Sequence, residues 1–210
     1  MVSVLVAIGL GYLCGSLPWG LWLGRLAKGV DVRTLGSRNL GATNVYRSLG
    51  AAVGVPVLLL DVAKGALPTW LVPRLALTAD FPGGSEWCRL AVALAAVMGH
   101  VFTVFARFRG GKGVATTAGV LLAISPPAFC VFLLVFVATV AVTRFISLGS
   151  MLGAVAFATT LGVIAPRGFA SPTFALGAAI ALLVIARHKD NIARLARGEE
   201  RRFSFRRGAA

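Results

Sequence analysis

Seven apolar runs, separated by short polar or proline-containing breaks, most restrict how this 210-residue chain can fold. The runs cover residues 4–24, 53–78, 88–106, 114–125, 127–143, 146–165 and 172–187. A helix needs about 20 apolar residues to cross a bilayer, and the 114–125 run is short for that. The pattern predicts an all-α membrane protein with about seven transmembrane helices. The stretches between the runs are too short for a separate soluble domain, so we expect a single integral membrane domain over 1–210, with a basic tail from about residue 188.

Composition supports the membrane class and argues against nucleic-acid binding. Hydrophobic residues make up 58% of the chain and charged residues only 13%, with a mean hydropathy of +0.86, which is far from the composition of soluble domains. The net charge of +14 comes from residues clustered between apolar runs, as juxtamembrane charges are. Nucleic acid is therefore not an expected partner. Cys14, Cys88 and Cys130 lie in apolar stretches without C-x-x-C spacing, which favours packing over metal binding or disulfides.

The distribution of basic residues predicts the orientation of the chain. Segments 25–50, 107–112 and 187–210 are rich in Lys and Arg, whereas 79–87 carries Asp80 and Glu86 without a basic residue. Cytoplasmic loops carry the excess of basic residues, so the three basic segments belong inside and 79–87 outside. The N-terminus is then outside and the C-terminus cytoplasmic. The start lacks the pattern of a signal peptide, so the first run is expected to remain as a span.

The segment "GSRNLGATNVYRSLG", residues 36–50, is dense in hydrogen-bonding groups for a connection between apolar runs. Three glycines accompany its polar residues, which are Ser37, Asn39, Thr43, Asn44 and Arg47. One interpretation is part of a cytoplasmic binding site. The alternative is an ordinary turn and helix cap with Arg47 as a headgroup anchor.

The segment "RFRGGKGVATTAG", residues 107–119, combines paired glycines with a lysine. Gly110, Gly111 and Gly113 allow close backbone approach, successive N–H groups can form an anion nest, and Lys112 adds a positive charge. The string lacks the spacing of a nucleotide P-loop, so it predicts a small phosphate site. The alternative is a glycine turn with a snorkelling lysine. His100 either binds at this site or is a structural helix residue.

Two further groups of polar residues complete the pattern. In "RHKDNIARLARGEERRF", residues 187–203, His188 and Asn191 are spaced to share a helix face, while the arginines from 201 to 207 favour contact with anionic lipid. Glu199 and Glu200 are expected to pair with nearby basic residues. Ser147 and Ser150 follow a predicted cytoplasmic turn and would border the site.

The second apolar run contains a potential ion pair. Asp61 and Lys64 are three residues apart within the run, and charged groups at that depth usually face the protein interior. The spacing leaves open whether the pair is architectural or touches substrate.

Together these segments make the sequence similar to the bacterial acyl-phosphate:glycerol-3-phosphate acyltransferases. The resemblance covers nearly the whole chain and depends on "GSRNLGATNVYRSLG", "DVAKG", "GHVFTVFARFRGGKGVATT" and "RHKDNIARLARGEE" in the order and spacing of the family. It implies a seven-helix protein of the bacterial cytoplasmic (inner) membrane with its active site open to the cytoplasm. Two positions depart from the family pattern: Arg38 stands where a glycine is usual, and Thr103 where a proline is usual.

The resemblance also implies roles for individual residues. It implies essential roles for Ser37 and Arg47, a glycerol 3-phosphate loop at 110–113, a functional pair at His188 and Asn191, and a structural glutamate at Glu200. We therefore expect catalytic roles for Ser37, Arg47, Lys112, His188 and Asn191. The expected substrate-binding residues are Asn39, Thr43, Asn44, His100, Gly110, Gly111, Gly113 and Ser147.

The implied reaction transfers a fatty acyl group from acyl phosphate to the 1-hydroxyl of glycerol 3-phosphate, giving lysophosphatidate and inorganic phosphate. The donor is already activated and no G-x-S-x-G elbow is present, so Ser37 is expected to donate a hydrogen bond to a phosphate. His188 or a substrate phosphate would take the proton. No metal or cofactor is expected, and the partners are the two substrates and membrane lipids.

The main alternative is an organic-phosphate transporter, although its path should place polar groups across the bilayer midplane. A basic lipid-binding scaffold would leave the glycine–lysine segment unexplained.

Overall fold

The computed structural model describes residues 1–203. These residues form helices joined by short connections and divide into two compact units, Met1–Ile124 and the part of the chain from Ser125 onward. The prediction of an all-α protein is confirmed. Each unit is described by itself below, and the prediction of one domain over the whole chain stays a prediction.

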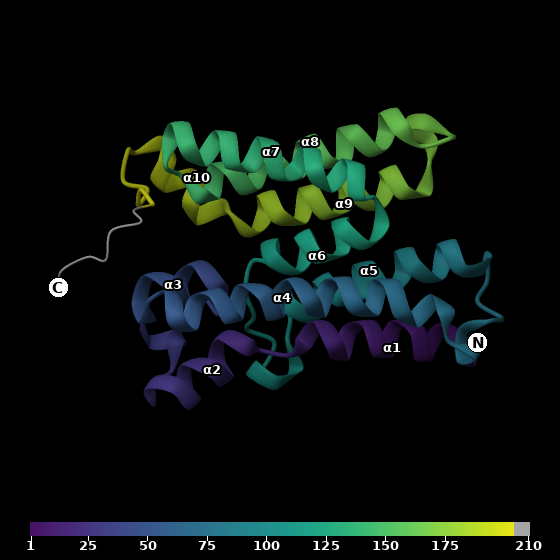
Figure 1. Ribbon diagram of the computed structural model, residues 1–210, viewed down its shortest axis with the longest axis horizontal. Helices are drawn as coiled ribbons and strands as arrows, with labels where there is room; N and C mark the ends of the chain where they lie inside the picture. Colours follow the sequence, from purple (N-terminus) through teal and green to yellow (C-terminus); the bar gives the residue numbers. More distant parts are fainter. Residues whose placement is uncertain (204–210) are drawn as a thin grey trace. The chain divides into compact units, whose positions relative to one another are not determined.

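The first unit is built on four helices that follow the first four apolar runs. α1 (Val2–Ser16) packs against α5 (Gly84–Val101), and α4 (Ala51–Leu71) packs against α6 (Val114–Ile124) (Figure 1). The short helices α2 (Trp19–Lys28) and α3 (Ala42–Leu49) follow α1 and precede α4. Single 3₁₀ turns at Val32–Thr34, Val72–Arg74, Ala76–Thr78 and Val104–Ala106 complete the unit.

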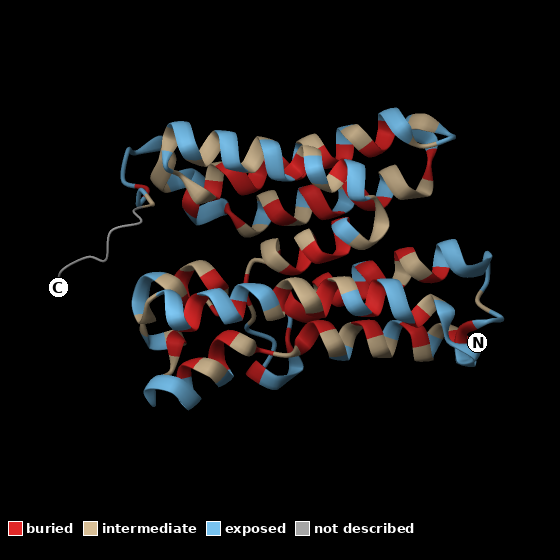
Figure 2. Cartoon of the chain, in the orientation of Figure 1, coloured by how far each residue is buried: buried red, intermediate tan, exposed pale blue. Residues whose placement is uncertain are grey.

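Small residues allow the helices of the first unit to approach closely. A side chain at Gly15 would overlap the backbone of Ala96 between α1 and α5, and one at Gly65 would overlap the backbone of Thr116 between α4 and α6. Close packing of this kind is typical of membrane helices, where lipid supplies no hydrophobic driving force between helices. Buried residues accordingly lie along the facing sides of these helices (Figure 2).

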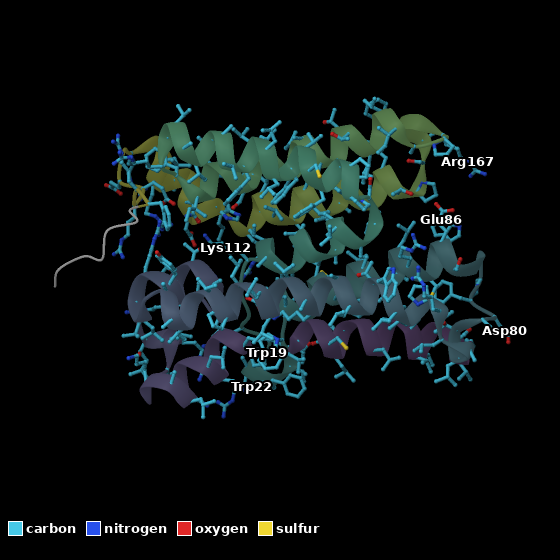
Figure 3. The ribbon with its side chains drawn as sticks, in the orientation of Figure 1. Trp19, Trp22, Asp80, Glu86, Lys112 and Arg167 are labelled. Atoms are coloured by element: carbon cyan, nitrogen blue, oxygen red, sulfur yellow. The ribbon has the colours of Figure 1, made fainter. Side chains whose placement is uncertain are left out.

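The first apolar run does not form one straight helix. It breaks at Leu17 and Pro18 into α1 and α2, because proline has no N–H to donate and disfavours helical geometry in the residue before it. Trp19 and Trp22 follow the break, with ring centroids 5.5 Å apart in an edge-to-face arrangement (Figure 3). The run at 4–24 alone did not reveal this division.

The second unit contains α7 (Pro126–Thr143), α8 (Ile146–Ile164), α9 (Pro172–Arg187) and α10 (Lys189–Ala196), with a 3₁₀ turn at Gly168–Ala170. α8 packs against both α7 and α9. Two of these helices have serine caps: Ser125 Oγ accepts from the Ala128 N–H at 3.4 Å, and Ser171 Oγ accepts from the Phe174 N–H at 3.0 Å. Each serine precedes a proline in the first helical position, where the missing N–H costs nothing.

Five helical stretches within residues 1–203 are long and apolar enough to cross a membrane. They are Val2–Lys28, Ala51–Arg74, Gly84–Ala106, Pro126–Thr143 and Ile146–Ile164, and α9 with α10 makes a sixth if that pair, bent by 58°, is one span. α6 has 11 residues, or about 17 Å of helix, which is shorter than a bilayer core. The membrane class is therefore supported, whereas the count of seven stays a prediction.

Charged residues separate along the first unit. Asp80 and Glu86 lie at the same end of the unit as the N-terminus, and Lys112 lies well away from them (Figure 3). This separation is what the predicted orientation requires of the first unit, although the side of the membrane that each end faces stays a prediction.

Candidate functional site

The loop before α3 is organised by the side chain of Asn44. This buried amide donates to the carbonyl oxygens of Val32, Leu35 and Asn39 at 3.3, 3.1 and 2.9 Å, and its Oδ1 accepts from the Ser37 N–H at 2.9 Å. Both amide hydrogens are thus used by carbonyls of the loop itself. The side chain of Asn44 therefore holds the loop in shape, and the contact with substrate expected from the sequence stays a prediction.

The other predicted residues of this segment lie on the surface of that loop or on α3. Ser37 and Arg47 are exposed, and Thr43 is partly buried. Asn39 turns the chain, since its Oδ1 accepts from the Gly41 N–H at 2.8 Å. Arg38 has a left-handed backbone with φ of 58°, a conformation that glycine adopts without strain.

An ion cluster precedes this loop. The Asp31 carboxylate accepts hydrogen bonds from Arg33 Nη2 at 2.6 Å and from Arg25 Nη2 at 2.9 Å, and it also caps the turn by accepting from the Arg33 N–H. These bonds, chiefly those from the Arg33 side chain, hold the pKa of Asp31 well below its usual range. Asp31 therefore remains charged and fixes the start of the loop.

The glycine–lysine segment forms a loop that returns onto the end of α5. The Gly110 N–H donates to Val101 O, and the Gly111 N–H donates to His100 O, both at 3.1 Å. These two N–H groups satisfy carbonyls that the end of α5 leaves without helical partners. The Gly110 and Gly111 N–H groups therefore point to protein acceptors in this structure, and the phosphate site expected at this loop stays a prediction.

The glycines of this loop are needed for reasons that the structure makes specific. A Cβ at Gly111 would overlap Nε2 of His100. Gly113 has a φ of 83°, which is costly for any residue with a side chain. Lys112 lies between them and is partly exposed, and α6 begins immediately afterwards at Val114. A lysine beside the positive end of a helix remains a suitable anion site.

His100 and the intramembrane ion pair belong to one buried cluster in the first unit. Lys64 Nζ lies 2.8 Å from Asp61 Oδ1, which confirms that the two residues pair. His100 Nδ1 lies 3.0 Å from Thr116 Oγ1 and 3.8 Å from the same Asp61 oxygen. All four side chains are buried. His100 thus meets the glycine–lysine loop from within the protein.

The second unit contains a separate buried polar cluster centred on Glu200. Its Oε1 accepts from Ser147 Oγ at 2.7 Å and from Asn191 Nδ2 at 2.6 Å, and its Oε2 accepts from Arg194 Nε at 2.8 Å. Burial alone raises the pKa of Glu200, but these three hydrogen bonds and the Arg194 charge outweigh it and lower the pKa. The expected pairing of Glu199 and Glu200 with basic residues is confirmed, since Arg197 binds Glu199 at 2.8 Å.

His188 lies at the bend between α9 and α10 and is buried. Its Nδ1 lies 2.7 Å from Val184 O. A carbonyl oxygen only accepts, so this bond fixes a proton on Nδ1 and places the lone pair of the neutral ring on Nε2. His188 caps the start of α10 and Asn191 lies within that helix, so the i, i+3 spacing expected from the sequence is retained, while the bend separates both residues from the axis of α9.

Some participants were not visible in the sequence. Thr116 looked like an ordinary residue beside the glycine–lysine motif, yet it contacts His100. Thr103 stood out only as a departure from the family pattern, and the structure shows that its hydroxyl donates to Ser16 O. Their partners are 16 and 87 residues away, so only the packing of helices reveals them.

Among residues 1–203, no group of three or more His, Cys, Asp or Glu side chains could hold a metal ion. Arg206 and Arg207, assigned to the lipid-binding tail, lie outside the described residues.

Comparison with known proteins identifies the family. The family model described as glycerol-3-phosphate acyltransferase matches residues 5–198. The chain belongs to the glycerol-3-phosphate acyltransferase family. A curated family member from Myxococcus xanthus strain DK1622 is 49% identical over 203 residues, covering 97% of this chain and 100% of the relative. The family expected from the four motifs is thereby confirmed.

Two solved structures of family members share the fold. One, described as PlsY (YgiH), an integral membrane glycerol 3-phosphate acyltransferase in its glycerol 3-phosphate form, has a TM-score of 0.85 and 38% identity, covering 96% of both chains. The lysophosphatidic acid form has a TM-score of 0.83 and 37% identity, again over 96% of both chains. The present chain therefore shares the fold of an integral membrane enzyme over nearly its whole length.

Proposed function

We propose that this protein transfers a fatty acyl group from acyl phosphate to the 1-hydroxyl of glycerol 3-phosphate, forming lysophosphatidate and inorganic phosphate. The family match over residues 5–198, which includes every predicted site residue, is the observation that carries the proposal. Related structures in glycerol 3-phosphate and lysophosphatidic acid forms support the acceptor and the product. The acyl-phosphate donor follows from the family resemblance of the four motifs. The reaction would begin phospholipid synthesis.

The first unit supplies the groups that bind phosphate in this proposal. Lys112 and Arg47 provide positive charge, and Ser37 donates a hydrogen bond to a phosphate oxygen. Asn39 and Thr43 complete the binding surface. Because the Gly110 and Gly111 N–H groups are used within the protein, attraction for the dianion comes from these side chains and from the N-terminal end of α6.

The chemical step needs little covalent help from the protein. The 1-hydroxyl oxygen attacks the acyl carbonyl carbon, an ester C–O bond forms, the bond to the phosphate oxygen breaks, and inorganic phosphate leaves with the bonding electrons. The hydroxyl proton passes to Nε2 of His188 or to a substrate phosphate. Asn191 orients the reacting groups. Ser147, which we predicted to bind substrate, donates a hydrogen bond to the same Glu200 oxygen as Asn191. Lys112 and Arg47 stabilise the negative charge that develops.

The proposal includes a location and an orientation. The chain would lie in the bacterial cytoplasmic membrane with seven crossings, its N-terminus outside, its C-terminus inside, and its active site open to the cytoplasm. The basic tail would contact anionic lipid headgroups. Acyl chains would be received directly from the bilayer, in an apolar groove among the helices.

The direct test measures phosphate release and lysophosphatidate formation by detergent-purified protein with palmitoyl phosphate and glycerol 3-phosphate. Lys112→Ala should lower kcat/KM at least about a hundredfold, the scale of losing one charge-stabilising group. Lys28→Ala, which removes an exposed lysine at the end of α2, should behave as wild type. Product from a palmitoyl thioester but none from palmitoyl phosphate would refute the donor. Binding of glycerol 3-phosphate by folded protein without any product would favour the transporter.

A further inference from the structure

The break in the first span leaves backbone carbonyls that need donors inside the membrane domain. Ser16 ends α1 and Pro18 provides no N–H, so the regular helical hydrogen bonds are interrupted at Ser16 and Leu17. The Trp19 N–H donates to Leu17 O at 3.1 Å, and side chains supply further donors. The Thr103 hydroxyl donates to Ser16 O, and Lys64 Nζ donates to Leu17 O at 2.6 Å. Lys64 therefore connects the break to α4.

The same lysine begins a chain of contacts that leads to the glycine–lysine loop. Lys64 pairs with Asp61 Oδ1, and that oxygen lies 3.8 Å from Nδ1 of His100. Thr116 Oγ1 lies 3.0 Å from the same ring nitrogen. The ring of His100 is thus oriented by side chains from α4 and α6.

His100 in turn determines where Gly111 lies. Its carbonyl oxygen accepts from the Gly111 N–H, and its Nε2 occupies the space that a side chain at position 111 would need. Gly111 is buried against it and directly precedes Lys112. The imidazole therefore packs directly against the backbone that carries the lysine.

A small cavity lies where these groups meet. Its volume is about 10 Å³, on the scale of one water molecule. Asp61, Lys64, His100 and Gly111 all line it, together with residues around the break in the first span. The cluster and the loop therefore share one surface within the first unit.

We propose that Asp61, Lys64, His100 and Thr116 form a positioning cluster that sets the geometry of the 110–113 loop for glycerol 3-phosphate. This inference deepens the proposed function and depends on it for the identity of the ligand. None of the four side chains needs to touch the substrate. They act through Gly111 on Lys112, which explains why two charges are kept inside the membrane at a high desolvation cost. His100 then positions the loop, a different role from the direct substrate contact expected from the sequence.

Two adjacent threonines of α6 provide a matched test. Thr116 contacts His100, whereas the Thr117 hydroxyl is buried without a hydrogen-bond partner among residues 1–203. Thr116→Val removes the contact at nearly constant volume and Thr116→Ser keeps it. Thr117→Val removes a buried hydroxyl of the same helix and serves as the control. The measured quantities are KM for each substrate, kcat, Tm, and the Kd of glycerol 3-phosphate by titration calorimetry.

We expect Thr116→Val to raise KM and Kd for glycerol 3-phosphate about fivefold, the effect of losing one hydrogen bond. KM for palmitoyl phosphate should stay within about twofold of wild type, as should every constant of Thr116→Ser and Thr117→Val. Equal glycerol 3-phosphate constants in the Val and Ser variants of Thr116 would overturn the proposal. So would a lower Tm of Thr116→Val with an unchanged KM, since that result assigns the cluster to stability alone.

Two further variants keep the test decisive. If Thr116→Val does not fold, the test uses His100→Gln in its place. His100→Asn is then the conservative variant, because the asparagine amide nitrogen can occupy the place of Nδ1 beside Thr116. The calorimetric Kd does not require turnover. A wild-type protein that binds glycerol 3-phosphate without forming product would refute the acyl-transfer proposal, while the contrast between the Thr116 variants would still decide the positioning cluster.

Discussion

Arg38 has a strained left-handed backbone because hydrogen bonds from Asn44 fix the shape of the loop around it. Asn44 draws three carbonyls of the loop inward and holds the Ser37 N–H, so the chain must turn sharply at position 38. The resulting φ of 58° gives a physical reason for the glycine that the family resemblance implies there. The sequence marked the position as unusual, and the tertiary contacts of Asn44 explain it.

Substitutions at position 38 should follow backbone preference. We expect Arg38→Val to destabilise the protein by about 1–2 kcal/mol, because a β-branched residue is strained in the left-handed region. Arg38→Gly should change stability by less than about 1 kcal/mol, since relief of strain is offset by greater freedom of the unfolded chain. Arg38→Asn should resemble wild type. Thermal unfolding in detergent checks the order, and equal Tm values for Val and Asn would contradict it.

At the scale of elements, the bend between α9 and α10 brings residues distant in sequence onto one carboxylate. Glu200 follows α10, yet it accepts a hydrogen bond from Ser147 at the start of α8, 53 residues away. The spacing of His188 and Asn191 was visible in the sequence, and the resemblance implied a structural role for Glu200. The meeting of Ser147, Asn191 and Arg194 on that carboxylate depends on how α8, α9 and α10 pack.

Glu200 should make the second unit sensitive to acid. Its folded-state pKa is lowered, so its contribution to stability is complete above the ordinary pKa of 4.5 and is lost as pH falls through the folded value. Glu200→Gln should cost about 1–3 kcal/mol near neutral pH, because Arg194 loses a charged acceptor. The free energy of unfolding measured from pH 7 to pH 3 should decline less steeply in this variant. Parallel curves for the two proteins would contradict the assignment.

For the whole molecule, the number of crossings depends on α6. Six crossings between Lys28 and Asp190, with α6 included, would put both residues on one side of the membrane. If the short α6 does not cross, five crossings would put them on opposite sides. Its 11 residues pack tightly against α4, with Gly119 against Val62, so burial in protein could compensate for its length.

Cysteine labelling in intact cells can decide this count. In a background without Cys14, Cys88 and Cys130, single cysteines replace Lys28, Asp80 and Asp190, which are all exposed. With a membrane-impermeant thiol reagent, we expect labelling at position 80 only before lysis and at all three positions after lysis. Labelling of both 80 and 190 before lysis would reduce the crossings to six in total.

The sequence alone determined the membrane class, the helical composition and the family, because long apolar runs and dense polar motifs are local properties of the chain. It also placed Asp61 and Lys64 within pairing distance, since their spacing follows from helix geometry. Only the tertiary structure decided that the Gly110 and Gly111 N–H groups serve the end of α5, that Asn44 shapes its own loop, and that His100 lies behind Gly111. These outcomes depend on which helices meet, and contacts across tens of residues leave no periodic pattern in the chain.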